Sequence, residues 1–157
     1  MQIPIPALQL PFDFYRILDD EFSIDKDVFA TKETTHAVSY IDDFSTSLKT
    51  PWEETNLLVL PSEGKVDWFE KIHNEIKKDK SKTVIVIAPV SMGSLWFHNY
   101  CAGQAEIRFV NGRIPLDGSE TAGTKDSMVL IFGKKAKRQK FNYSSMTYRK
   151  KKETANT

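Results

Sequence analysis

The segment from Leu57 to Ala88 constrains the fold of this chain more than any other. It opens with the unbroken apolar run Leu57–Leu60 and closes with the apolar, β-branched run Thr83–Ala88. Runs of this length and composition are typical of strands that are buried on both faces of a sheet. Between them, Lys65–Lys80 carries its apolar residues on one stripe, which predicts an amphipathic helix. A strand, a helix and a strand at this spacing predict a βαβ unit, so we expect an α/β domain with a mainly parallel sheet.

Weaker patterns on both sides of this unit predict its neighbours. Phe14, Leu18 and Phe22 recur every four residues, which predicts a helix over 12–22. We expect short strands at 27–30 and 37–40, a short helix at 95–101, and further strands at 106–110 and 128–132. Asn111-Gly112 is a hairpin-turn signal. The stretch 118–126 lacks periodicity, which predicts a mobile surface loop.

The net charge of +1 conceals two unlike parts. After Gly133 nine basic residues face one acidic residue, a balance of +8, whereas residues 1–133 carry −7. We therefore expect a globular domain over 1–133 and a basic tail over 134–157. Cations neutralise phosphates and interspersed aromatic rings stack on bases, so the tail predicts nucleic-acid binding, although an acidic partner protein or the acidic domain itself would also match its charge. Its basic residues are Lys134, Lys135, Lys137, Arg138, Lys140, Arg149, Lys150, Lys151 and Lys152.

Other features narrow the class of protein. Cys101 is the one cysteine, so the chain forms no internal disulfide and no Cys-x-x-Cys metal site. The three histidines are scattered, and we expect no metal. No apolar run approaches the roughly 20 residues that a membrane helix needs, and the amino terminus lacks the pattern of a signal peptide, so we expect a cytoplasmic protein without membrane contact. Glycine-rich phosphate loops and a Gly-x-Ser-x-Gly elbow are also missing, which leaves nucleoside triphosphate binding and serine hydrolysis without a motif.

The order of several segments resembles the phage-type DNA N6-adenine methyltransferases. The similarity runs from Leu10 to Phe132 and includes Leu18-Asp19-Asp20-Glu21-Phe22, an apolar strand that ends in Pro61, and Trp96-Phe97-His98. Its most specific part is Ala105–Ile114. The resemblance implies a Rossmann-like methyltransferase core and an S-adenosylmethionine pocket beside the strand that contains Asp27. The residues alone leave another interpretation open, in which Asp27 is simply an exposed end of an acidic strand.

The resemblance fails where the chemistry would be done. Enzymes of this kind carry Asp/Asn-Pro-Pro-Tyr/Phe at the end of a strand, where a side-chain oxygen and a backbone carbonyl accept hydrogen bonds from the adenine amine and the ring stacks on the flipped base. The four aligned positions here are Leu60, Pro61, Ser62 and Glu63, and only the proline is retained. Leucine accepts no hydrogen bond, and glutamate offers no ring.

The altered tetrapeptide predicts a methyltransferase-like protein that has lost catalysis, and cofactor use with it. Such a protein would act as a binding or regulatory factor, as the inactive partner of an active enzyme, or as a phage factor on host machinery in the host cytoplasm. The alternative is an active N6-adenine methyltransferase with a divergent site, in which Glu63 or Asp27 recognises the amine. A third hypothesis is an accessory protein that binds DNA or RNA through its tail.

Overall fold

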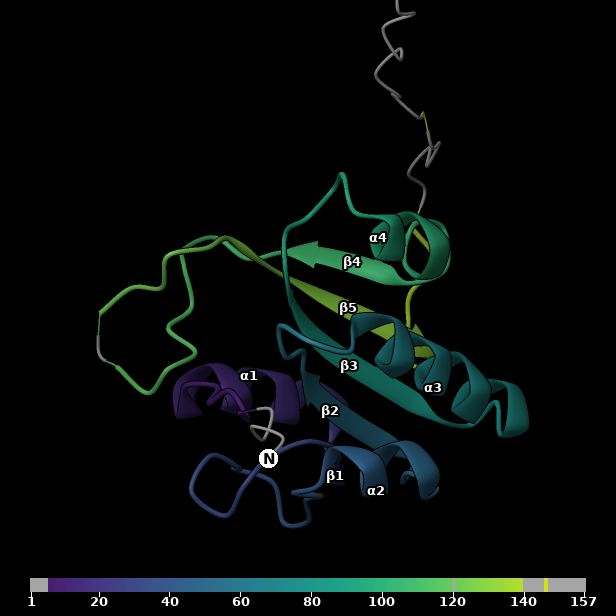
Figure 1. Cartoon of the computed structure of the whole chain (residues 1–157), viewed down its shortest axis with the longest axis horizontal. Helices are drawn as coiled ribbons and strands as arrows, with labels where there is room; N and C mark the ends of the chain where they lie inside the picture. Colours follow the sequence, from purple (N-terminus) through teal and green to yellow (C-terminus); the bar gives the residue numbers. More distant parts are fainter. Residues whose placement is uncertain (1–5, 120, 140–145, 147–157) are drawn as a thin grey trace, which may run out of the picture.

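The computed structural model describes residues 6–119, 121–139 and 146. These residues form one five-stranded sheet, in the order β1-β2-β3-β5-β4, with helices on both faces (Figure 1). The strands are β1 (Lys26–Asp27), β2 (Thr55–Val59), β3 (Thr83–Pro89), β4 (Glu106–Phe109) and β5 (Ser127–Gly133). The helices are α1 (Phe12–Phe22), α2 (Phe44–Lys49), α3 (Lys65–Lys78) and α4 (Leu95–Tyr100).

The predicted βαβ unit is confirmed. β2 pairs in parallel with β3, Leu57 lies opposite Ile85, and α3 connects the two strands. β1 continues the parallel part on the other side of β2. The prediction of a mainly parallel sheet holds for this end only, because β5 is antiparallel to both β3 and β4. β4 therefore runs in the same direction as β3, and the last strand fills the space between them in the opposite direction.

The core has two layers because side chains alternate across the sheet. One face, with Leu58, Val84 and Val86, packs against α3 and α4. The opposite face, with Leu57 and Ile85, packs against α1 and the segment that precedes it. α1 has the predicted bounds, and it begins directly after Pro11, a residue suited to a helix start.

Three local predictions are wrong. Of the strand expected at 27–30 only Asp27 lies in β1, which begins one residue earlier at Lys26, and the strand expected at 37–40 is reduced to a single bridge between Tyr40 and Asp27. α2 was not expected, although the Asp43 carboxylate caps it by accepting a hydrogen bond from the Thr46 N–H at 2.7 Å. Asn111-Gly112 does not form a two-residue hairpin turn, because residues 110–126 all lie between β4 and β5. Short polar segments of this kind follow tertiary contacts more than their own pattern.

None of the described helices is long and apolar enough to cross a bilayer.

Candidate ligand cavity

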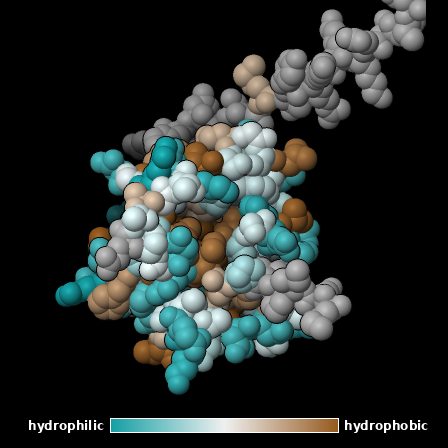
Figure 2. Space-filling view, turned by 60° about the vertical axis from the view of Figure 1, so that its left-hand side comes forward, coloured by the Kyte–Doolittle hydropathy of each residue, from teal (hydrophilic) through white to brown (hydrophobic). Residues whose placement is uncertain are grey.

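A cavity of about 350 Å³ opens at the carboxyl ends of β2 and β3. Its floor is apolar: Leu60, Ile87 and Ile114 line it and are each less than a tenth exposed. Figure 2 shows the hollow as an apolar patch surrounded by polar residues. Open α/β sheets bind ligands at this edge, and the volume lies in the range of small-molecule sites.

One wall of the cavity is built by described residues of the segment 114–127, which comprises most of the connection between β4 and β5 and the first residue of β5. Backbone hydrogen bonds fix it in place: the Gln9 N–H donates to the Leu116 carbonyl at 2.9 Å, and the Gly123 N–H donates to the Arg113 carbonyl at 3.1 Å. A Cβ atom at Gly123 would lie 2.3 Å from the Ile114 carbonyl oxygen, so only glycine fits there. The sequence pattern predicted a mobile surface loop here and missed its role as a wall.

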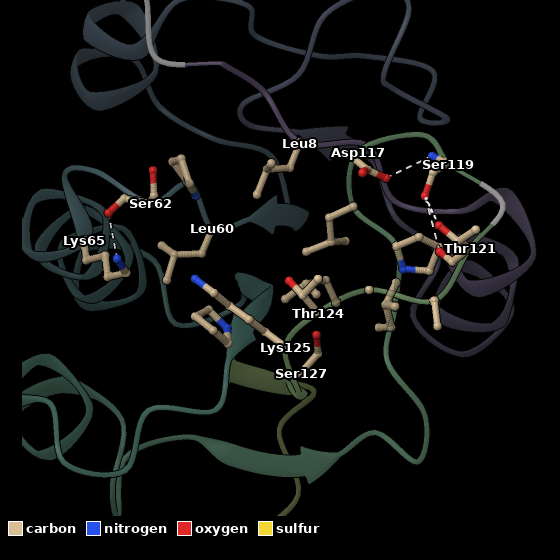
Figure 3. A pocket seen from close by; sticks show the side chains of 18 residues that line it. Leu8, Leu60, Ser62, Lys65, Asp117, Ser119, Thr121, Thr124, Lys125 and Ser127 are labelled. Atoms are coloured by element: carbon tan, nitrogen blue, oxygen red, sulfur yellow. Dashed lines mark hydrogen bonds between the residues drawn. The ribbon is translucent and has the colours of Figure 1, made fainter.

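Polar and charged side chains form the rim. Lys65 lies at the start of α3 and donates a hydrogen bond to the Ser62 carbonyl at 2.7 Å. On the opposite wall, the Asp117 carboxylate accepts the Ser119 N–H at 2.9 Å, and this bond keeps the pKa of Asp117 below its usual value. Lys125 extends from the wall across the cavity, with its ammonium toward Leu60 (Figure 3). None of the 18 lining residues is aromatic.

The four residues of the altered tetrapeptide lie in different environments at this end of the sheet. Leu60, Pro61 and Ser62 line the cavity, and the buried Leu60 side chain is only 3% exposed. Glu63 is exposed to solvent and does not line the cavity. The side chain at the first position therefore presents only hydrocarbon to a ligand.

Asp27 lies away from this cavity, inside the fold. The residue is 4% exposed, so the interpretation as an exposed strand end is wrong. Its carboxyl oxygen accepts the Phe29 N–H at 3.4 Å, and burial raises the pKa of Asp27 to about 7. Burial together with the nearby carboxylates Asp19 and Asp27 also raises the pKa of Tyr15 to about 12. A carboxyl group with such a high pKa is a buried, partly protonated group.

The residues that follow Asp27 do not fit a bound S-adenosylmethionine. Val28, Phe29 and Ala30 are each at most 4% exposed. The chain itself covers them: the Ala30 N–H donates to the Ile41 carbonyl at 3.0 Å, and the Phe44 ring contacts Phe29. An adenosine-sized ligand at the end of β1 would have to displace these contacts.

The start of the basic tail lies at the other edge of the sheet. Gly133 pairs with Thr83, the first residue of β3, and the Lys134 N–H donates to the Lys82 carbonyl at 3.0 Å. The Gln139 side chain then bonds to both backbone groups of Ile107 on the outer strand, at 2.9 and 2.6 Å. Of the predicted nucleic-acid contacts, the structure describes Lys134, Lys135, Lys137 and Arg138, whereas Lys140, Arg149, Lys150, Lys151 and Lys152 lie outside the described residues.

The histidines and carboxylates form no metal centre in the part of the chain that the structure describes. No group of three or more His, Cys, Asp or Glu side chains there could hold an ion. The Nε2 atoms of His36 and His73 instead lie 2.7 and 3.0 Å from the carbonyl oxygens of Leu10 and Tyr100.

The sheet order, with the antiparallel β5 inserted beside β3 and a cavity at the carboxyl ends of parallel strands, fits a Rossmann-like domain of the methyltransferase type. The family model for DNA N-6-adenine-methyltransferase (Dam) matches residues 7–157, so the chain belongs to this family. No curated protein matches the chain. The family implies S-adenosylmethionine as the methyl donor.

Proposed function

We propose that this chain is a DNA-binding member of the family that does not transfer methyl groups. The proposal rests on the buried hydrocarbon side chain of Leu60. Methylation of adenine requires an acceptor that orients the amine toward the methyl group, and the aligned side chain here is a buried hydrocarbon at the base of the cavity. An amine held against it would lose its hydrogen bonds to water without replacement, at a cost of about 1–3 kcal/mol.

Neither substitute acceptor is well placed. Glu63 is exposed outside the cavity, and Asp27 is enclosed by the fold with its carboxyl bonded to the Phe29 N–H. The covered end of β1 also favours loss of S-adenosylmethionine binding, because Val28, Phe29 and Ala30 leave little open surface.

DNA binding is supported by family membership and by the placement of positive charge. Lys65 and Lys125 stand on the rim of the cavity, and the basic tail adds nine cations to the chain. Such cations attract the phosphate backbone without reading its sequence.

The test incubates the full chain with adenine-containing duplex DNA and labelled S-adenosylmethionine. We expect no methyl transfer above a heat-denatured control, no heat of cofactor binding by calorimetry, and DNA binding that weakens with salt. Methylation that Glu63→Ala abolishes would overturn the proposal and favour an active, divergent enzyme. Glu33→Ala, which removes another exposed carboxylate, is the matched control.

A protein that neither methylates nor binds DNA would also contradict the proposal, because DNA binding is the activity that it retains. Both results are read from the same preparation, and a thermal unfolding curve verifies that each variant is folded.

A further inference from the structure

We propose that the cavity binds an unpaired base that presents carbonyl oxygens and a ring methyl group, as thymine does, and discriminates against adenine. The inference rests on the proposed function, since it names the base that a DNA-binding, non-methylating cavity would accept. It rests on one end of the cavity, where Leu60 stands in place of a hydrogen-bond acceptor and the Lys125 ammonium supplies a donor.

The first step is the floor. Leu60, Ile87 and Ile114 present aliphatic carbon to a ligand and are 3%, 1% and 8% exposed. Aliphatic carbon is the surface that a thymine methyl group contacts in protein–DNA recognition. The described lining residues also include no aromatic ring, so binding here does not rely on stacking, which would serve every base alike.

The second step is Lys125. Its ammonium extends across the cavity toward Leu60 (Figure 3), and an ammonium is a donor only. Among the described residues, no carboxylate forms an ion pair with it. An adenine amine placed at this end is also a donor and would oppose the cation, whereas a thymine O4 atom placed there is an acceptor.

The third step is the position of the acceptors. Asp117 is the sole carboxylate among the described residues of the lining, and it already accepts the Ser119 N–H. Figure 3 shows Asp117 beside Ser119, on the other side of the cavity from Leu60. Ser62 and Thr124 carry hydroxyl groups, which can accept the N3–H of thymine. The end of the cavity at Leu60 and Lys125 thus combines a hydrocarbon surface with a cationic donor.

The experiment isolates one base. Single-stranded 12-mers, abasic at every position but one, carry thymine, uracil, adenine or cytosine at the centre, and their binding to the full chain is measured by fluorescence anisotropy. We expect thymine to bind about tenfold more tightly than adenine, the lower end of the effect of a hydrogen bond to a charged group. Uracil should bind about fourfold more weakly than thymine, the effect of one buried methyl group.

Variants at Lys125 and Leu60, with Lys77→Gln as a control, test whether the cavity causes the preference for thymine. Lys125→Gln should bring the thymine-to-adenine ratio close to one, whereas Lys77→Gln, which removes an exposed lysine on α3, should weaken both oligonucleotides equally. Leu60→Asn supplies an amide oxygen at the end of β2 and should raise the affinity for adenine. Leu60 is buried, so a polar residue there can prevent folding. If Leu60→Asn does not fold, the variant at the exposed Lys125 tests the proposal by itself.

Equal binding of the four bases, or a thymine preference that survives Lys125→Gln, would overturn this inference and leave the proposed function intact. Methyl transfer to adenine would overturn the proposed function instead. Failure to bind any oligonucleotide or duplex would overturn both.

Discussion

Leu60 lies where a buried strand meets a cavity, and one side chain there changes which ligand the edge of the sheet can hold. Its position was predictable, since an apolar run that ends in Pro61 marks the carboxyl end of a strand. The position of Lys125, across the cavity from Leu60, was not predictable. Lys125 comes from a segment without periodicity, and only the folded wall brings the two residues together.

Glu75 is a buried carboxylate that joins three segments. It accepts Lys71 and Lys82 at 2.6 Å each and the Trp52 N–H at 3.2 Å. Burial pushes the pKa of Glu75 upward, but these hydrogen bonds outweigh it and hold the pKa below the ordinary value. We expect Glu75→Gln to lower the free energy of unfolding at pH 7 by about 3 kcal/mol, because both cations lose a buried partner.

Urea denaturation measures the effect of Glu75→Gln, with the exposed Glu33→Gln as control. A group with a lowered pKa stabilises the fold above its unfolded pKa and loses that contribution as pH falls through its folded pKa. The variant and the native chain should therefore converge in stability as the solution becomes strongly acidic. A constant difference at every pH would contradict the ionic role of Glu75.

For Asp27, the pH dependence of its contribution to stability has the opposite sign to that of Glu75. Because burial raises its pKa to about 7, the folded state holds a proton that the unfolded chain has already released above about pH 4. Its contribution to stability therefore falls as pH rises from about 4 to 7. Asp27→Asn should stabilise the fold at pH 8, by up to about 4 kcal/mol, and change little at pH 4.

Thermal unfolding of Asp27→Asn and of the native chain across this pH range checks the sign. A variant that is less stable than the native chain at pH 8 would mean that the ionised carboxylate is needed inside the fold.

At the scale of elements, the segment 114–127 is a wall because of Gly123. Gly123→Ala would drive its Cβ against the Ile114 carbonyl and break the hydrogen bond to Arg113. We expect a loss of about 1–3 kcal/mol in stability and faster amide exchange across the wall. Gly93→Ala is the matched control, because nothing lies within 4 Å of a Cβ at that glycine. Equal exchange in the two variants would show that the wall tolerates the displacement.

The helices α1, α3 and α4 and the central strands were predictable, whereas α2 and the segments around β1 were not. α1, α3 and β3 carry strong periodic or β-branched patterns that agree with their burial. Between β1 and β2, the chain instead follows backbone bonds such as that from the Asp27 N–H to the Ser39 carbonyl. These contacts cover the end of β1, where the resemblance implies a cofactor pocket, and no local sequence pattern indicated them.

At the scale of the whole molecule, the cavity and the described start of the tail lie at opposite ends of β3, which spans roughly 20 Å. We expect the tail to contribute affinity and the cavity to contribute base preference. Replacing Arg149, Lys150, Lys151 and Lys152 by glutamine should flatten the slope of log affinity against log salt concentration, for duplex DNA, by up to about 3.6.

The salt dependence is measured by anisotropy titrations at several salt concentrations. Four exposed lysines of the domain, Lys32, Lys49, Lys77 and Lys78, are replaced by glutamine as a control for total charge. An unchanged slope in the tail variant would exclude the tail as a phosphate contact, while thymine preference in the one-base assay should persist in it.

The place of β5 in the sheet has a consequence for how the chain is made. Among the described strands β5 comes last in the sequence, yet it pairs with β3 along seven residues and is the only one of them that pairs with β4. During synthesis β4 therefore emerges with its ladder groups unpaired, and β3 keeps one unpaired edge until β5 has been made. Such edges template aggregation. A ribosome stalled before Ser127 would thus carry a half-built sheet, and chaperones would be needed most in that interval.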